Sequence, residues 1–520
     1  TGVTGPRAAP AVEVARSGVT AADVVAVARH DAKVRLTDDA LGAMATSRAA
    51  VERLADAPEP AYGISTGFGA LATRHIAPEL RDDLQISLIR SHSAGMGPPV
   101  EREVVRAMMF LRLKTLASGR TGARPVIAET IARMLDAGIT PVVPEQGSLG
   151  CSGDLAPLAH CALAMTGEGE VLGADPGQRV PADEALAAAG ISPARLATKE
   201  GLALINGTDG MLGMLVLALD DLALLCRTVD VTASMSVEAL LGTDRVFRPE
   251  LHAPLRPHPG QIVSADNMFR ILAGSGIVAS HRAGDPRVQD AYSCRCAPQV
   301  TGAVRDTMAH AGAVADRELA ASIDNPVVLD TGEVTSNGNF HGAPLGYVMD
   351  FLAIAIADLG SMAERRTDRM LDRARSDGLP PFLAADPGVD SGLMIAQYTQ
   401  AAMVSENKRL AAPASVDSIP TSAMQEDHVS MGWNAGRKLR RAVVNLRRIL
   451  AVELVTAARA LELRPVAPAP ATAAVVAALR TVVPGMGRDR FTSPELARAE
   501  AFVASGAAVE AAASSAGPLP

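Results

Sequence analysis

Apolar residues recur at helical spacing in the later part of the chain. Leu439, Val443, Leu446, Leu450 and Leu454 follow one another in steps of three and four. This spacing places them on one face of a helix. The pattern therefore predicts a long amphipathic helix whose apolar face is buried against other helices.

Similar patterns predict further helices. We expect them over residues 207–228, 300–322, 345–375 and 391–410, with a shorter one beginning at Ala471. Aspartates interrupt the most apolar of these stretches, so none of them offers the roughly 20 uninterrupted apolar residues of a bilayer span. The basic residues between 437 and 448 are expected to form a solvated face of the long helix. Pro465 is expected to end that helix, because a proline ring cannot continue it.

The region before residue 206 has a more mixed pattern, in which short helical stretches alternate with glycine- and proline-rich loops. Glycine permits positive φ angles and close backbone approach, which loops near a ligand often need. The expected organisation is a flexible N-terminus (1–18), a loop-rich N-terminal domain (19–205), a central bundle of long helices (206–465) and a C-terminal helical segment with a flexible tail (466–520). The tail is expected from Ala507 onward, because Ala, Gly, Pro and Ser dominate it.

The composition agrees with a mainly α protein. Of the 520 residues, 48% are hydrophobic but 3% are aromatic, so aliphatic side chains and methionine must fill the core. Such a core favours close-packed helices over a β-sandwich, whose strands are usually richer in aromatic and β-branched residues.

The charge excludes two classes of partner. The formal net charge is -8 at pH 7, whereas binding to nucleic acid or to an anionic membrane depends on a positive surface. Five cysteines do not build a disulfide scaffold in a chain of this length, and the first residues lack the basic and apolar regions of a signal peptide. We therefore expect a cytoplasmic protein with no nucleic-acid or membrane partner.

Common cofactor and metal motifs are absent from the sequence. It contains no HExxH, EF-hand loop, P-loop or dinucleotide-binding glycine motif. Cys294 and Cys296 have no second cysteine pair that would complete a zinc site, and we expect them to be buried as small apolar side chains. No metal site is expected.

One glycine-rich run offers unusual chemistry. Cys151, Ser152 and Gly153 are followed by Asp154, which stands where a serine-hydrolase elbow would have its last glycine. Because Gly153 has no side chain, its amide nitrogen is unshielded and could reach the carbonyl carbon of Cys151. Ring closure with loss of one water, and elimination of the Ser152 hydroxyl as a second, would give a five-membered ring with an electron-poor methylidene. An ordinary glycine-rich loop is the alternative that the residues alone leave open.

This run resembles the signature of the histidine/phenylalanine ammonia-lyase family, in which an Ala-Ser-Gly or Cys-Ser-Gly triad becomes 4-methylideneimidazole-5-one (MIO). Six further segments resemble family motifs in the family order: the tyrosine loop 62–69, the Asn-Gly-Thr segment 200–208, the tyrosine-arginine loop 289–299, and segments 324–326, 338–341 and 425–431. Ordered matches at so many places are not expected by chance.

The resemblance implies a fold, a cofactor and an assembly. The implied fold is mainly α and similar to that of L-aspartase and fumarase, with a central bundle of long helices and a loop-rich N-terminal domain that carries the MIO. The MIO would form from Cys151, Ser152 and Gly153, so no external organic cofactor is expected. The family forms homotetramers whose active sites draw on three chains, and we expect the same here. The implied activity is that of a carbon–nitrogen lyase that releases ammonia.

Two positions indicate L-histidine as the substrate within this family. Histidine-specific members carry Ser-His where this chain has Ser91 and His92, although some tyrosine-specific members also have His there. The segment around Glu426 resembles the histidine-specific form as well, whereas aromatic-substrate members tend to have Asn-Gln-Asp. Glu426 could accept a hydrogen bond from one imidazole nitrogen while His92 pairs with the other. The expected products are trans-urocanate and ammonia.

Further roles carry over from the family by position. Tyr62 is the expected base for the β-proton, which requires a phenol more acidic than usual, since an unperturbed tyrosine is protonated at neutral pH. Arg295 is expected to bind the substrate carboxylate, a task suited to a planar bidentate donor. Asn206 is expected to hydrogen-bond to the MIO carbonyl or to the substrate, and Tyr292 and Gln289 are expected to line the site. Phe340 is expected to pack beside the MIO, and Asp154 to assist MIO formation.

Two departures and two alternatives remain at this stage. Ser65 stands where many family members carry Asn, and Cys151 replaces the commoner Ala without changing the ring-forming atoms. One alternative is another MIO-dependent enzyme, either a tyrosine or phenylalanine ammonia-lyase or an aminomutase that returns ammonia to the β-carbon. The other is a non-catalytic helical family member without MIO. Addition to the MIO through the substrate amine is favoured over addition through the imidazole ring, because it directly improves the leaving group.

Overall fold

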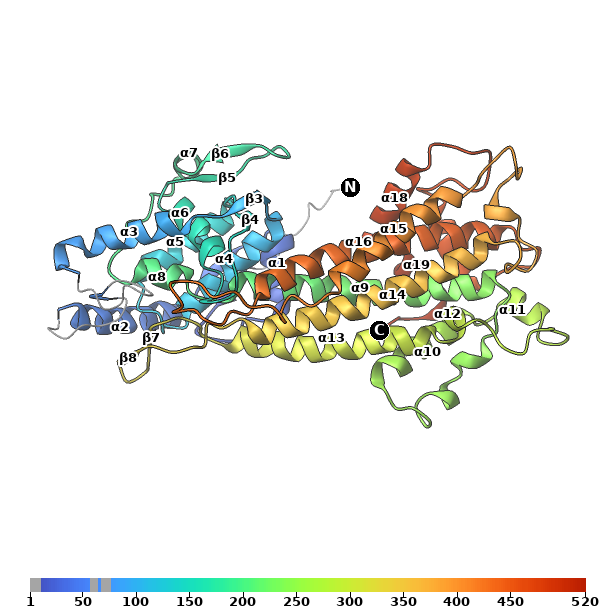
Figure 1. Ribbon diagram of the computed structural model, residues 1–520, viewed down its shortest axis with the longest axis horizontal. Coiled ribbons are helices and arrows are strands. Elements are labelled where there is room, and N and C mark those ends of the chain that lie inside the picture. The colour runs from blue at the N-terminus through green and yellow to red at the C-terminus, as the bar shows by residue number, and fades with distance from the viewer. Residues whose placement is uncertain (1–10, 57–63, 67–75) are drawn as a thin grey trace, which may run out of the picture. The chain divides into compact units, whose positions relative to one another are not determined.

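The computed structural model describes residues 11–56, 64–66 and 76–520, and it is mainly helical (Figure 1). The chain divides into two compact units. The first contains residues 1–217, 312–349 and 413–437, and the second contains residues 218–311, 350–412 and 438–520. The mainly α fold that the sequence predicts is confirmed. The domain boundaries expected near residues 205 and 465 stay predictions.

The first unit contains the shorter helices of the N-terminal region and four small strand pairs. Its complete helices are α1 (Ala21–Arg29), α2 (Asp38–Ala55), α3 (Arg81–His92), α4 (Arg102–Ala117), α5 (Pro125–Asp136), α6 (Leu155–Met165), α7 (Ala182–Ala188) and α8 (Glu200–Ile205), with a 3-10 helix at Pro78–Leu80. Its strand pairs are β1 (Val12–Val14) parallel to β2 (Val34–Leu36), and the antiparallel pairs β3 (Met96–Pro99) with β4 (Pro144–Gln146), β5 (Glu170–Leu172) with β6 (Arg179–Pro181), and β7 (Val327–Val328) with β8 (Val334–Thr335).

Local sequence sets the boundaries of these helices. Thr20 and Asp23 form a capping box at the start of α1, in which each side chain accepts a hydrogen bond from the backbone N–H of the other. Pro125 opens α5, at a position where the missing N–H of proline costs nothing.

The core of the first unit is built around α4. Every residue of this helix from Val104 to Ala117 is buried, and α1, α2, α5 and α6 pack against it. Two of its arginines, Arg106 and Arg112, are among the largest fully buried side chains of the described residues. A helix that is buried on all sides has no amphipathic pattern, so its periodicity in the sequence does not reveal it.

The four longest helices of the described residues contribute to both units. They are α9 (Asp209–Ala239), α13 (Ala297–Ala320), α14 (Ala343–Leu371) and α16 (Gly432–Glu462). The second unit also contains α10 (Pro259–Ile271), α11 (Gly276–Ser280), α12 (Tyr292–Arg295), α15 (Met394–Leu410), α17 (Pro470–Leu479), α18 (Ser493–Ala504) and α19 (Ala507–Ala516), with 3-10 helices at Arg245–Phe247, Pro249–Leu251 and Pro381–Leu383.

A buried polar network joins three helices inside the second unit. Arg366 of α14 forms an ion pair with Glu453 of α16, and their side chains are 1% and 0% exposed. Thr232 and Ser236 of α9 donate to the same carboxylate at 2.8 Å each. Because a buried carboxylate must be paired and hydrogen-bonded, this network fixes the three helices relative to one another.

The helices expected from periodicity are confirmed, with shifted ends. α9 continues to Ala239 rather than ending near residue 228, because the residues after Thr228 stay buried in the second unit. The long helix α16 ends at Glu462, just before Pro465, and α17 supplies the shorter helix expected from Ala471. Cys294 is buried as expected, whereas Cys296 is partly exposed.

Three local expectations are wrong. Residues 507–516, expected in a mobile tail, form α19, which packs against α17 and buries Ala508 and Ala512. Alanine has the highest helix propensity, so the composition that resembles a flexible tail also suits a packed helix. Arg440, expected on a solvated face, is 6% exposed and forms an ion pair with Asp221 at 2.8 Å. In the expected flexible N-terminus, Val12–Val14 form β1, while residues 1–10 lie outside the described residues.

One helix in the described part of the chain, α14, is long and apolar enough by length and composition to cross a membrane. Of its most apolar window, 61% is buried in the structure. Burial of this extent is typical of a core helix.

Candidate active site

The Cys151-Ser152-Gly153 segment lies in the first unit, between β4 and α6. Gly153 has a φ of +78°, which an L side chain rarely adopts. A Cβ at this position would lie 2.1 Å from the carbonyl oxygen of Gly207. Glycine is therefore required here both by the backbone conformation and by the space.

Asp154 is the first residue after this segment, and its carboxylate is completely buried. One oxygen accepts a hydrogen bond from the Ser148 hydroxyl at 2.8 Å, and the other accepts from the backbone N–H of Met211 at 2.9 Å. Burial raises the pKa of Asp154 to about 7, although both hydrogen bonds favour the charged form. The carboxyl group can therefore hold or release a proton near neutral pH.

Asn206 and Gly207 form the turn between α8 and α9 that faces Gly153. The backbone N–H of Asp154 donates to the Gly207 carbonyl at 2.7 Å. The side-chain amide of Asn206 donates to the carbonyl of Asn325 at 2.8 Å. Its Oδ1 is buried and has no hydrogen-bond partner among the described residues. A buried oxygen of this kind is ready to accept from a ligand.

Glu426 lies beside the Cys-Ser-Gly segment. Its Oε1 accepts a hydrogen bond from the Ser152 hydroxyl at 3.2 Å, and its Oε2 accepts from the Thr421 hydroxyl at 2.9 Å. Burial, followed by the negative charge of Glu426, raises the pKa of the Cys151 thiol to about 12. Cys151 therefore stays a neutral thiol at physiological pH and is not a nucleophile.

His92 ends α3 and is half-buried in the same unit. Burial lowers the pKa of its imidazole, and the opposing charge of Glu426 raises it by less. The ring is therefore neutral near pH 7, with one donor and one acceptor nitrogen. Its Nδ1 lies 3.0 Å from the Ser91 hydroxyl.

The segment that carries Phe340 is also tied to the start of this site. The backbone N–H of Gly342 donates to the Gly150 carbonyl at 3.3 Å, and the Ser430 hydroxyl donates to the same oxygen at 3.1 Å. Phe340 itself is half-buried. The next residue, His341, stacks on His428 with 5.5 Å between the ring centroids. Segments 338–343 and 425–431 thus converge on Gly150 in the first unit.

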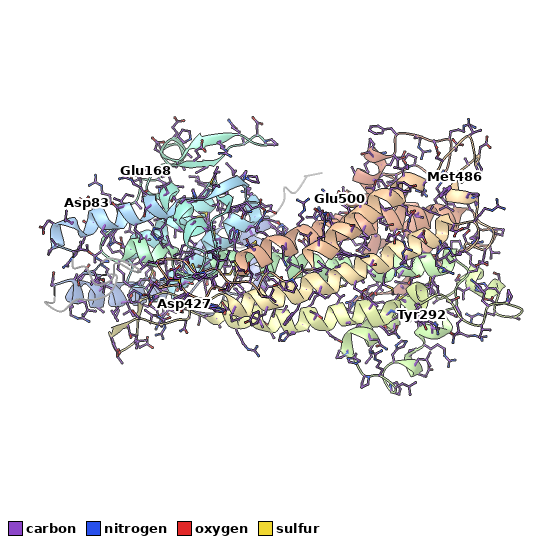
Figure 2. The ribbon with its side chains drawn as sticks, in the orientation of Figure 1. Asp83, Glu168, Tyr292, Asp427, Met486 and Glu500 are labelled. Atoms are coloured by element: carbon purple, nitrogen blue, oxygen red, sulfur yellow. The ribbon has the colours of Figure 1, made fainter. Side chains whose placement is uncertain are left out.

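Three expected site residues, Gln289, Tyr292 and Arg295, belong to the second unit. Tyr292 and Arg295 lie on α12, where the guanidinium carbon of Arg295 is 4.8 Å from the centroid of the Tyr292 ring. The Tyr292 side chain is 71% exposed (Figure 2), and Gln289 is exposed as well. The Nε of Arg295 is buried without a hydrogen-bond partner in the described part of the chain.

The expected base, Tyr62, lies outside the described residues. The first unit therefore brings together eight expected site residues, by the contacts of their own segments: Cys151, Ser152, Gly153, Asp154, Asn206, Glu426, His92 and Phe340. Among the residues that the structure describes, no group of three or more His, Cys, Asp and Glu side chains could hold a metal ion.

Sequence reasoning missed the residues that hold this segment in place. Ser148 supports Asp154, and Gly207 packs against Gly153. Ser148 stands in the same glycine-rich run, and its spacing from Asp154 could have suggested a local hydrogen bond. Arg112 of α4, which bonds the Asn206 carbonyl at 3.2 Å, gives no signal in the sequence, because the contact depends on tertiary packing.

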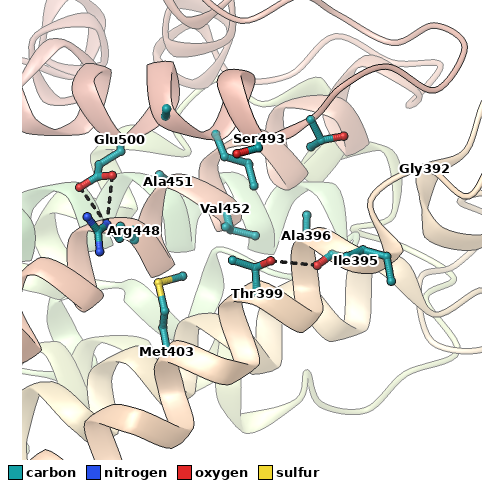
Figure 3. Close-up of a pocket in the computed structure, with 13 residues that line it drawn as sticks. Gly392, Ile395, Ala396, Thr399, Met403, Arg448, Ala451, Val452, Ser493 and Glu500 are labelled. Carbon is teal, nitrogen blue, oxygen red and sulfur yellow. Dashed lines mark hydrogen bonds and ion pairs between the residues drawn. The ribbon is translucent and has the colours of Figure 1, made fainter.

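A cavity of about 400 Å³ lies elsewhere, in the second unit, among α15, α16 and α18 (Figure 3). Ile395, Thr399 and Met403 of α15 line one side of it. At one end, Arg448 and Glu500 form an ion pair at 3.1 Å. None of the expected site residues that the structure describes lines this cavity.

The comparisons with known proteins agree with the geometry of the first unit. The model of the aromatic amino acid lyase family matches residues 19–481. The chain belongs to this family, which is the MIO-dependent class of carbon–nitrogen lyases. The family resemblance predicted from the motifs is confirmed.

Three relatives with high sequence identity to this chain are histidine ammonia-lyases. A histidine ammonia-lyase from Streptomyces coelicolor is 66% identical over 98% of this chain and 99% of its own length. A histidine ammonia-lyase from Streptomyces griseus is 67% identical over the same shares of the two chains. A histidine ammonia-lyase from Deinococcus radiodurans is 47% identical over 93% of this chain and 91% of its own.

Solved structures of several family members share the fold. A tyrosine aminomutase from Streptomyces globisporus matches with a TM-score of 0.92 and 38% identity, over 98% of this chain and 99% of that one. A histidine ammonia-lyase from Trypanosoma cruzi matches with a TM-score of 0.88 and 36% identity, over 96% and 94% of the two chains. The fold therefore does not distinguish a lyase from an aminomutase.

The residues present fit the MIO that the family implies. The conformation and the space at Gly153 exclude any side chain, as ring closure through its nitrogen requires. The orphaned Oδ1 of Asn206 lies in the turn packed against this glycine. The replacement of the commoner Ala by Cys151 leaves the ring-forming backbone atoms unchanged.

Proposed function

We propose that this protein is a histidine ammonia-lyase, which converts L-histidine to trans-urocanate and ammonia without oxidation. The high identity to histidine ammonia-lyases over nearly the whole chain supports the activity. The observation that carries the substrate assignment is the carboxylate of Glu426, which lies within hydrogen-bond distance of Ser152 and close enough to His92 to influence its pKa.

The imidazole of the substrate explains why both residues are needed. One ring nitrogen carries a proton and can donate a hydrogen bond to Glu426, and the neutral His92 can pair with the other nitrogen. A phenyl side chain could make neither of these hydrogen bonds, and a phenol could make at most one of them. A mismatch of this kind costs a factor of about 10⁴ in discrimination where a site is built for the polar group.

We further propose that Cys151, Ser152 and Gly153 form an MIO in this chain. When formed, this group supplies an electrophile that activates the amino group for elimination. The residues around it act by binding and proton transfer. Asn206 accepts a hydrogen bond from the substrate amine through its Oδ1, a role supported by the lack of any other partner for this buried oxygen, and Asp154 supports formation of the ring with a proton held near neutral pH.

The remaining roles belong to Tyr62, as the base that removes the β-proton, and to three residues of the second unit. Arg295 binds the substrate carboxylate, because its Nε is buried without a partner and a guanidinium suits a carboxylate. Tyr292 and Gln289 line the site from an exposed position. Phe340 packs beside the MIO.

We propose that these groups meet across the subunits of a cytoplasmic homotetramer. Large apolar side chains on the helices of the second unit are exposed in the single chain, among them Phe351 and Ile354 of α14 and Ile395 and Tyr398 of α15. Exposed apolar residues gathered on helices are typical of surfaces that a partner covers.

A substrate panel tests the proposal against its rivals. The purified protein is incubated in parallel with L-histidine, L-tyrosine and L-phenylalanine, and products are separated by liquid chromatography. We expect turnover of histidine at least 100-fold faster than that of the other two. The alternative activity is that of a tyrosine aminomutase, since the structure of such an enzyme matches this chain with a TM-score of 0.92. That activity predicts β-tyrosine as the product instead. A non-catalytic family member would turn over none of them.

A further inference from the structure

The buried side chain of Arg112 on α4 holds four acceptors at once. Its guanidinium donates to the carbonyl oxygens of Ala203 at 2.9 Å, Asn206 at 3.2 Å and Ile323 at 3.2 Å. It also forms an ion pair with Asp209 at 2.7 Å, and its side chain is 2% exposed. All of these residues belong to the first unit.

These acceptors surround the turn at Gly207. Ala203 and Asn206 lie at the end of α8, and Asp209 begins α9. A Cβ at Gly207 would lie 1.9 Å from Nη2 of Arg112, so the guanidinium lies directly against this turn. The same turn also contacts Gly153, whose added Cβ would lie 2.1 Å from the Gly207 oxygen and 2.4 Å from its carbonyl carbon.

The Gly207 turn therefore contacts both Arg112 and the Cys-Ser-Gly segment. The hydrogen bond from the Asp154 N–H to the Gly207 carbonyl, at 2.7 Å, also connects the turn to the residue that follows Gly153. Because Arg112 donates to Ala203 and Asn206 before Gly207 and to Asp209 after it, the turn cannot recede, so it limits the space into which Gly153 could relax.

Arg106 on the same helix provides a comparison. It is buried to the same degree, with a side chain that is 0% exposed, and it donates to the carbonyls of Val27 and Leu135. Neither of these residues lies in the segments that contact Gly153. Two equally buried arginines of one helix thus hold different parts of the first unit.

We propose that Arg112 is a positioning residue for formation of the MIO. By holding the Gly207 turn against Gly153, it keeps the backbone folded so that the Gly153 nitrogen stays near the Cys151 carbonyl carbon. Orienting two reacting groups in this way can accelerate a ring closure by many orders of magnitude. The inference rests on the proposed function, in which this ring forms.

The reaction that Arg112 would promote requires no oxidant and no external reactant. The Gly153 nitrogen bonds to the Cys151 carbonyl carbon, and its proton passes to the carbonyl oxygen. The hydroxyl formed on the Cys151 carbonyl carbon then leaves with the amide proton of Ser152 as the first water. This step creates a C=N bond between the Cys151 carbonyl carbon and the Ser152 nitrogen. The Ser152 hydroxyl leaves with the α-proton as the second water, which creates the C=C bond of the methylidene.

Intact mass spectrometry of freshly produced protein tests this inference directly. The fraction of chains that are lighter by two waters is followed over time for wild type, Arg112→Lys and Arg106→Lys. We expect Arg112→Lys, which keeps the charge but not the fork of donors, to slow the loss of the two waters at least tenfold. Arg106→Lys should lower the melting temperature comparably but leave the rate of water loss within about twofold of wild type.

The outcomes separate this inference from the proposed function. If wild type loses two waters and Arg112→Lys loses them at the same rate, the positioning role is wrong and the proposed function stands. If wild type itself never loses them, both are wrong. If Arg112→Lys does not fold, Gly207→Ala replaces it, because the added methyl would displace the turn from Arg112. The same tenfold slowing is then required, and an unchanged rate overturns the inference.

Discussion

The hydroxyl of Ser152 donates a hydrogen bond to Glu426 at 3.2 Å, across 274 residues of sequence. Ser152 is the residue that must lose its hydroxyl to form the methylidene, and Glu426 is the residue proposed to recognise the imidazole. In the proposed function, their contact would put substrate recognition directly beside the electrophile. The reacting amino group of histidine and its ring can therefore be bound from one cluster of the first unit.

Replacing Glu426 with glutamine should lower kcat/KM for L-histidine by about 10- to 100-fold, because a hydrogen bond to a charged group contributes roughly 1.5–3 kcal/mol. Steady-state kinetics measures the effect. The loss of two waters should persist in this variant, since the side chain keeps its size. Asp417→Asn, an exposed change in the non-helical stretch that precedes Glu426, is the matched control and should keep wild-type kinetics. Equal kcat/KM in wild type and Glu426→Gln would remove this residue from the site.

Replacing Ser152 with alanine should abolish both the loss of the second water and the activity. Alanine has no hydroxyl to eliminate, so the methylidene cannot form even if the ring closes. We expect the intact mass to show at most one lost water and turnover to fall at least 1000-fold, whereas the far-UV circular dichroism should match wild type. Substantial urocanate production by the folded variant would contradict a role for MIO.

The buried carboxyl of Asp154 predicts a specific pH dependence of stability. Its pKa is raised from 3.8 to about 7 in the folded protein, so the folded state keeps a proton that the unfolded chain releases between these values. Stability contributed by this group is therefore present at low pH and lost as the pH rises to about 7. The slope is up to about 1.4 kcal/mol per pH unit.

Urea unfolding of Asp154→Asn and of the parent at pH 5, 6, 7 and 8 checks the direction in which stability changes with pH. Both proteins should carry Ser152→Ala, so that differences in MIO content do not contribute. The free energy of unfolding of the Asn variant, relative to its parent, should rise with pH up to about 7. A difference that is independent of pH would show that Asp154 does not titrate in this range.

The second unit offers a test of its buried network. Glu453→Gln removes the charge that neutralises Arg366, and leaving a buried charge unpaired costs about 3–5 kcal/mol. Glu406→Gln is the matched control, because its partner Arg441 is 65% exposed and such pairs contribute about 0–1 kcal/mol. Denaturant unfolding compares the two variants. Similar losses in both would mean that the buried network adds no more stability than a surface pair.

Much of this fold could be predicted from the sequence, because amphipathic periodicity marks helices with one buried face. The apolar face around Leu446 predicts α16 in this way. The fully buried α4 has no such face, and the alanine-rich α19 has the composition of a flexible tail. Both depend on tertiary packing, which a local pattern does not contain.

The same distinction between local sequence and tertiary packing applies to the site. The chemistry of Cys151, Ser152 and Gly153 allows ring formation and the family signature selects it over an ordinary loop, while Glu426 and His92 follow from family motifs. The hydrogen bonds that connect them do not, because they join segments that lie far apart in the chain. Arg112 illustrates the limit, since nothing distinguishes it from Arg106 until the Gly207 turn is seen against it.

The most direct test of the central claim measures both products of L-histidine in one reaction. Urocanate is followed by its ultraviolet absorbance and ammonia by a coupled assay, in the same samples over time. We predict that both appear together in equal amounts, at the expense of histidine. Absence of urocanate from a folded protein that has lost two waters would contradict the assignment of histidine as the substrate.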